Sequence, residues 1–185
     1  MYIKHEIERH EGASSKWSIM IDKIKIREKG DWAKWWHYIV PVFVWIVGIF
    51  NSNFKDQFYN QFLNAIGDTI YYPKGFEYDH EKHFGVIRHE MRHIYDWSCC
   101  FVIGYLLSKR RRLHWELRGY AQNLAHEYFM KGEISELHFN HVVEMLESDM
   151  YLNMTDNARP YVKKIVNIIK QSDYDSFNFV NERLT

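Results

Sequence analysis

The chain has 185 residues, and its 24 lysines and arginines balance its 24 aspartates and glutamates, so its formal net charge is +0. This length suits one domain with a buried core, and the aromatic content of 17% is too high for a disordered chain. A neutral chain lacks the surplus of basic charge that nucleic-acid binders use, so no nucleic-acid partner is expected. The only cysteines, Cys99 and Cys100, are adjacent, which excludes a fold held by disulfides.

The first third of the chain predicts a strand and an apolar segment. Ile19–Arg27 is expected to be a short strand, because apolar and charged residues alternate in it. Trp35–Phe54 carries no formal charge and is almost wholly apolar over residues 39–50. A membrane-spanning helix needs about 20 apolar residues, and Asn51 ends the run before that length. We therefore expect buried core here, with membrane contact through residues 35–50 as the alternative.

A helix and a second strand are predicted next. Residues 54–66 have apolar residues at helical spacing, and the predicted helix ends at Gly67; these residues are Phe58, Phe62 and Ile66. Thr69–Tyr72 has the composition of a strand. Pro73 directly follows this strand, and its position predicts that the strand lies at a sheet edge.

The most informative motif is His-Glu-x-x-His at residues 89–93. On a helix, His89 and His93 lie on one face, close enough for both imidazoles to bind one zinc ion. Glu90 lies next to the first ligand, where it can accept a proton from water instead of binding the metal. The alternative is a helix without a metal site that exposes the two histidines to solvent.

A catalytic zinc site needs a third protein ligand, and Glu116 is the best candidate. It opens a predicted helix that begins at Trp115, runs to about Met130 and ends at Gly132. Gly119, one turn after Glu116, removes side-chain bulk where two helices would have to approach closely. The alternative interpretation of Glu116 is a solvated glutamate in the first turn of its helix.

Neighbouring residues receive weaker assignments. Asp96 is too far along the first helix to reach the metal easily, so we expect it to orient a histidine. Tyr120 and His126 are candidate donors to the oxyanion that forms during acyl transfer. The basic run 109–112 is interpreted as a solvated loop, and two further helices are predicted around 134–146 and over Pro160–Gln171.

Residues from about Gly67 to Met130 resemble the small gluzincin-type metallopeptidases that bacteriophages and bacteria often encode. The resemblance rests on the strand Gly67–Pro73, on the His-Glu-x-x-His motif, and on two segments after it, Tyr105–Leu107 and Glu116-x-x-Gly119-Tyr120. It implies that Glu116 is the third zinc ligand and that Glu90 is the general base. The sequence departs from the family at Gly119, where alanine is usual. About a third of the chain is covered.

These observations predict an α+β, mainly helical fold, zincin-like, with an active-site helix, a second ligand-bearing helix and a small sheet. One domain is expected over 1–185, with an N-terminal part (1–66), a metal-site core (67–131) and C-terminal helices with a tail (132–185). The predicted function is zinc-dependent hydrolysis of peptide bonds in a polypeptide substrate.

Two alternatives to a soluble peptidase remain open. One is a catalytically silent structural or interaction protein of the zincin fold, for example a component of a phage virion. The other is a peptidase that contacts a membrane through residues 35–50. The first residues begin no apolar run of the kind that a signal peptide needs, so a cytoplasmic or phage-particle location is expected.

Overall fold

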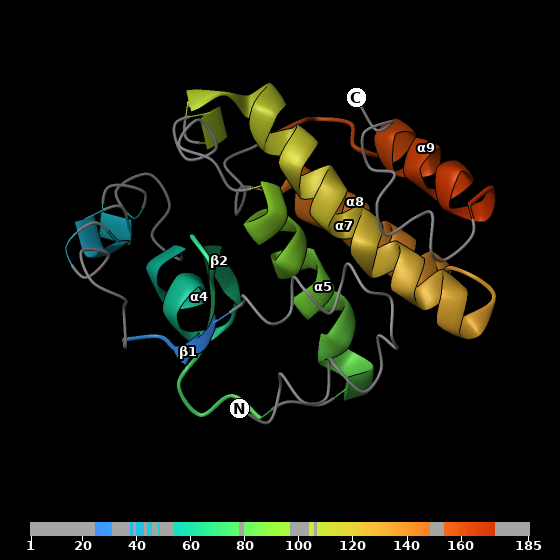
Figure 1. Cartoon of the computed structure of the whole chain (residues 1–185). Coiled ribbons are helices and arrows are strands. Elements are labelled where there is room, and N and C mark those ends of the chain that lie inside the picture. The colour runs from blue at the N-terminus through green and yellow to red at the C-terminus, as the bar shows by residue number, and fades with distance from the viewer. Residues whose placement is uncertain are drawn as a thin grey trace. The chain divides into compact units, whose positions relative to one another are not determined.

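The computed structural model of the chain describes residues 25–30, 38, 40–42, 44–45, 48, 54–77, 80–96, 104–105, 107–148 and 154–172. The protein is α+β and mainly helical, as the sequence predicts (Figure 1). It divides into two compact units, residues 1–84 and 85–185, and each is described by itself. The single domain predicted for 1–185 stays a prediction, and Cys99 and Cys100 lie outside the described residues.

A small sheet lies in the first unit. Its strands are β1 (Lys25–Glu28), β2 (Asn64–Ile66) and β3 (Thr69–Tyr72), in the spatial order β1-β3-β2. The first pair is parallel and the second is antiparallel. The strand Thr69–Tyr72 is therefore central, and the edge position predicted from Pro73 is wrong. Proline is tolerated there because it follows the last paired residue and needs to donate no hydrogen bond to the sheet. Of the strand predicted over Ile19–Arg27, residues 19–24 lie outside the described part.

The helix predicted over residues 54–66 is shorter in the structure. Helix α4 spans Phe54–Asn60, and residues 64–66 form β2. Gly67 has a φ of +64°, a left-handed conformation that lets the chain turn directly from β2 into β3. Pairing with the neighbouring strand thus overrides the helical spacing of Phe62 and Ile66.

Lys29 connects the sheet to the end of α4. Its buried ammonium group donates hydrogen bonds to the backbone carbonyls of Phe58 and Phe62. Phe58 lies in the last turn of α4, where carbonyls have no partner within the helix and a lysine is a suitable donor, and Phe62 lies two residues beyond the helix. A positive charge is therefore accommodated in the interior of this unit.

The apolar segment is described only at scattered positions, and these are helical. Val40 and Val44 are buried with Phe58 and Tyr71 in one apolar cluster, as the core interpretation predicts. The opposite side is exposed, at Tyr38, Val42 and Trp45. Within the described residues, no helix combines the length and the apolar character needed to cross a membrane. Membrane contact through residues 35–50 stays a prediction.

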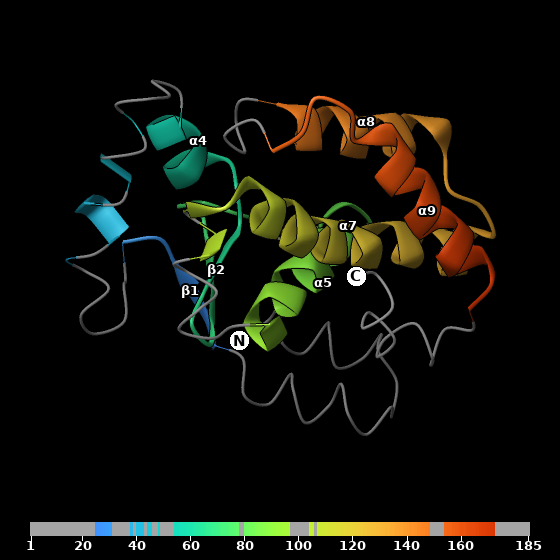
Figure 2. The same ribbon diagram turned by 90° about the horizontal axis from the view of Figure 1, so that it is seen from above.

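Helix α7 is the centre of the second unit. The unit contains most of α5 (His80–Asp96), together with α7 (Lys109–Lys131), α8 (Glu136–Glu147) and α9 (Arg159–Lys170). Figure 2 shows α7 between α5 on one side and the pair α8 and α9 on the other. The core against α8 and α9 is built from fully buried apolar residues, among them Leu124, Val142, Leu146, Val162 and Ile169. Because α7 is covered on both sides, it has no single apolar stripe.

The start of α7 differs from the prediction. The helix begins at Lys109, six residues before Trp115, and the basic run 109–112 forms its first turn. Ser108 is the N-cap, and its hydroxyl accepts a hydrogen bond from the backbone N–H of Arg111 at 3.3 Å. The other end was predicted correctly, because Gly132 closes the helix with a φ of +80°.

Glu127 fixes the connection between α7 and α8. Its carboxylate accepts hydrogen bonds from the Ser135 hydroxyl at 2.9 Å and from the His138 ring nitrogen Nδ1 at 2.7 Å. Ser135 is also the N-cap of α8. Burial raises the pKa of Glu127, but the hydrogen bonds from His138 and Ser135 outweigh burial and hold the pKa below its ordinary value.

We predict that Glu127→Gln lowers the free energy of unfolding by about 1–2 kcal/mol near neutral pH. A carboxylate whose pKa is depressed by folding stabilises the fold above its unfolded pKa of about 4.3, and this stabilisation disappears as the pH falls through the folded value. The loss caused by the substitution should therefore shrink toward about pH 3, as measured by urea unfolding. Glu144→Gln, at an exposed position of α8, is the control. An equal loss at both pH values would contradict this account.

Candidate metal centre

Helix α5 brings His89 and His93 together. The two residues are one turn apart on the same face, and both are buried. Their Nε2 atoms are 2.9 Å apart, and the rings meet edge to face with centroids 4.7 Å apart. At this distance the two ring nitrogens can share a hydrogen bond, and they are also close enough to bind one ion. The histidines are therefore not displayed to solvent.

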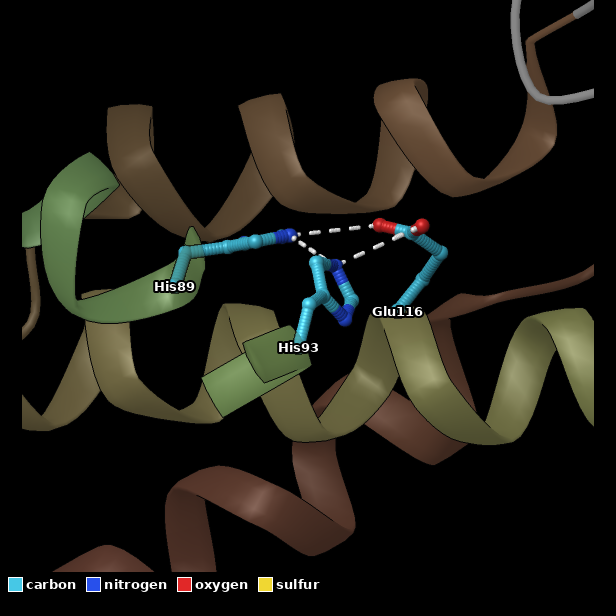
Figure 3. Close-up of side chains that lie close together, drawn as sticks. All are labelled: His89, His93 and Glu116. Carbon is cyan, nitrogen blue, oxygen red and sulfur yellow. Dashed lines mark hydrogen bonds and ion pairs between the residues drawn. The ribbon is translucent and has the colours of Figure 1, made fainter. Parts of the chain in front are cut away.

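Helix α7 contributes the third group, Glu116. Figure 3 shows its carboxylate pointing toward the two imidazoles. Glu116 Oε2 lies 3.3 Å from His89 Nε2, and Oε1 lies 3.6 Å from His93 Nε2. The side chain is 3% exposed, so it is not a solvated glutamate of a first helical turn. The structure thus brings together the three residues that the sequence selects as ligands.

The three groups lie close enough together to hold a metal ion. Tetrahedral zinc bonds of about 2.0–2.1 Å place neighbouring donor atoms about 3.3 Å apart. His89 Nε2 lies 2.9 Å from His93 Nε2 and 3.3 Å from Glu116 Oε2, whereas the 3.6 Å distance to His93 belongs to the other oxygen, Oε1. Glu116 Oε2 is buried and accepts no hydrogen bond from the described part of the chain. A buried carboxylate oxygen without a donor is a favourable position for a cation. Two imidazoles and one carboxylate also form the ligand set of a zinc site that keeps a position open.

Electrostatics in the group favour an ionised Glu116. Burial by itself raises the pKa of Glu116, but His93 and His89 outweigh burial and hold it far below its ordinary value. For His93, burial lowers the pKa, but the charge of Glu116, with smaller contributions from Glu90 and Asp96, outweighs it and raises the pKa. A carboxylate that is already ionised needs to lose no proton before it binds a metal.

Gly119 and Tyr120 lie against His89. A Cβ atom on residue 119 would stand only 2.6 Å from His89 Nε2, so this contact requires glycine. The ring of Tyr120 meets the imidazole of His89 edge to face, with centroids 4.6 Å apart. Tyr120, predicted as an oxyanion donor, is buried and packs against the ring of His89 in this structure.

Asp96 is bound by arginines. Its carboxylate accepts two hydrogen bonds from Arg92, at 2.9 and 3.0 Å, and pairs with Arg118 of α7 at 3.0 Å. Asp96 was expected to orient a histidine, but among the described residues its carboxylate accepts no hydrogen bond from one, because two guanidinium groups occupy it. Burial raises the pKa of Asp96, although Arg92 opposes it. Asp96 therefore joins α5 to α7 beside the ligand group.

The remaining predicted residues lie at different distances from the group. Glu90 is buried. Burial lowers the pKa of His93 and raises the pKa of Tyr105, and the charge of Glu116 raises both. The charge of Glu90 makes a smaller contribution that raises both pKa values further. His126 lies beside Gly85, one turn of α5 before His89. It is ten residues beyond Glu116, or about 15 Å along the helix. Nothing in the structure places His126 at the three ligands.

One residue of the site received no role from sequence reasoning. The hydroxyl of Tyr105 donates a hydrogen bond to Glu116 Oε1 at 2.6 Å. Burial and then the charge of Glu116 raise the pKa of this tyrosine well above its ordinary value, so the hydroxyl keeps its proton. The two residues are eleven positions apart, which would separate them by about 16 Å along a continuous helix. The sequence carries no signal for this contact.

Comparisons with protein-family models, with curated proteins and with solved structures each find no match to this chain. The assignment of the site therefore rests on its residues and their geometry.

We predict that Gly119→Ala weakens zinc binding by about ten-fold or more, because the added methyl group must displace the ring of His89. Gly85→Ala is a matched control. Its added methyl group would stand 2.7 Å from Asn123 Oδ1, an equally tight contact between the same two helices that involves no ligand. Zinc affinity of both variants can be measured by competition with a chromophoric chelator. Equal affinities for the two variants would contradict the steric argument.

Proposed function

We propose that this protein is a zinc-dependent metallopeptidase of a zincin-like fold, with His89, His93 and Glu116 as the metal ligands. The observation that supports this most directly is the convergence of these three buried side chains, from two helices, at 2.9–3.6 Å. The amino-acid composition alone does not bring these three side chains together. Burying an ionised carboxylate costs free energy unless charged or polar partners compensate it. The resemblance of the motif to gluzincin-type peptidases points to the same activity.

The chemistry follows from the residues around the ligands. When bound, a zinc ion would act as a Lewis acid that lowers the pKa of water to about 7 and polarises a carbonyl group. Glu90 follows the first ligand directly in sequence and is buried. It is proposed to take a proton from the attacking water and to deliver it to the amine that leaves when the peptide bond breaks. His89, His93 and Glu116 hold the metal in place for this step.

We predict that Glu90→Gln retains zinc and loses hydrolysis by a factor of about 100 or more, because glutamine cannot accept the proton. Zinc per chain can be measured by atomic emission, and turnover by the release of peptides from an unfolded protein such as casein. Activity of the unchanged chain should disappear with a chelator and return with zinc. Glu133→Gln, at an exposed position, is the control.

The same two measurements separate the peptidase from the silent structural protein. Full zinc content without cleavage by the unchanged chain would favour the structural role. Unchanged turnover in Glu90→Gln would remove Glu90 from the mechanism. We further expect that Glu116→Ala loses most of its bound zinc, because two imidazoles alone leave the ion without its third protein ligand.

A further inference from the structure

Tyr105 makes a direct contact with the third proposed ligand. Its hydroxyl lies 2.6 Å from Glu116 Oε1. The tyrosine donates and the carboxylate oxygen accepts, and a hydrogen bond to a carboxylate is stronger than one between neutral groups. One of the two carboxylate oxygens is thereby occupied by a group of the protein.

The side chains of α7 hold Tyr105 in this position. Arg112 donates from Nη1 to the backbone carbonyl of Tyr105 at 2.6 Å, and its guanidinium lies 5.9 Å from the centre of the tyrosine ring. Trp115 stacks on the same ring, at 6.4 Å between centroids and 16° between planes. Trp115 and Glu116 lie three and four residues after Arg112, so the three side chains share one face of α7. This face contacts the backbone, the ring and the hydroxyl of Tyr105.

Gly104 allows the backbone before α7 to come this close. A Cβ atom on residue 104 would stand 2.8 Å from Arg111 Cδ and 2.9 Å from Trp115 Cη2. The chain thus folds back onto the helix at a point where only glycine fits. The position of the Tyr105 hydroxyl follows from this contact and is fixed relative to Glu116.

The two oxygens of Glu116 are therefore not equivalent. Oε1 accepts the hydrogen bond of Tyr105 and lies 3.6 Å from His93 Nε2. Oε2 lies 3.3 Å from His89 Nε2 and accepts no hydrogen bond from the described residues. We propose that Tyr105 is a positioning residue that makes Glu116 a one-oxygen ligand through Oε2. This inference rests on the proposed metal site. A carboxylate that binds through both oxygens takes two positions around the ion, whereas binding through one oxygen leaves the fourth position of a tetrahedral site open.

The test is Tyr105→Phe in the full chain, which keeps the ring against Trp115 and removes only the hydroxyl. We expect zinc affinity, measured by competition with a chromophoric chelator, to fall about 10- to 100-fold. With cobalt in place of zinc, the visible bands of the unchanged chain should have the high intensity of a four-coordinate ion. In the variant these bands should weaken, as the freed carboxylate binds through both oxygens and the coordination number rises.

Tyr128→Phe is the matched control, because it removes the same hydroxyl from a half-buried tyrosine of α7 that lies twelve residues beyond Glu116. Its zinc affinity and cobalt spectrum should equal those of the unchanged chain. A role of Tyr105 in packing alone would move the unfolding midpoint of Tyr105→Phe and leave both metal readouts unchanged, and this result would overturn the proposal.

The outcomes also separate this proposal from the metal site itself. If the unchanged chain binds zinc and Glu116→Ala does not, the site stands, and equal binding by Tyr105→Phe then refutes only the role of the tyrosine. If the unchanged chain binds no zinc, both proposals are refuted. If Tyr105→Phe does not fold, the cobalt spectrum of the unchanged chain decides, because the weak bands of a five- or six-coordinate ion would contradict one-oxygen ligation.

Discussion

A buried negative charge is the constraint on which the second unit depends. The carboxylate of Glu116 is removed from water, and such a charge is tolerated only where partners replace the lost hydration. Here the partners are two imidazoles of α5 and the hydroxyl of Tyr105. Because these groups come from different segments, their interactions with Glu116 hold α5 and the residues before α7 against α7. The same requirement makes the location suitable for a cation, which would compensate the charge more completely.

The site takes its geometry from the packing of α7. One side of this helix forms the apolar core with α8 and α9, and the other side carries Glu116 and Gly119 toward α5. The core therefore determines where the carboxylate stands, while the absence of a side chain at Gly119 determines how near His89 can come. At the far end of α5, Asp96 binds arginines of both helices. Ligands held on rigid helices in this way need little rearrangement to bind an ion.

Several features of the fold were predictable because they depend on neighbours in the chain. The paired histidines needed only the helical period, and the end of α7 needed only Gly132. The helix predicted over Pro160–Gln171 is present as Arg159–Lys170, since its apolar spacing and its proline at the first turn are local signals. The structure also brings Glu116 to the two histidines. The sequence selects it because a two-histidine motif requires a third ligand from another segment, and its role as a ligand stays a prediction.

Other features could not be predicted, because they depend on contacts between distant residues. Residues 64–66 have helical spacing, yet they pair with β3 as a strand. The basic run 109–112 has the charge of a solvated loop, yet Ser108 caps it as a helix and Arg112 packs against Tyr105. By itself the sequence determined the identity of the three converging side chains, since the chemistry of ligation selects residue types and the helical period places two of them. Only the tertiary structure decided which oxygen of Glu116 accepts the hydrogen bond of Tyr105, because this bond requires the chain to fold back at Gly104.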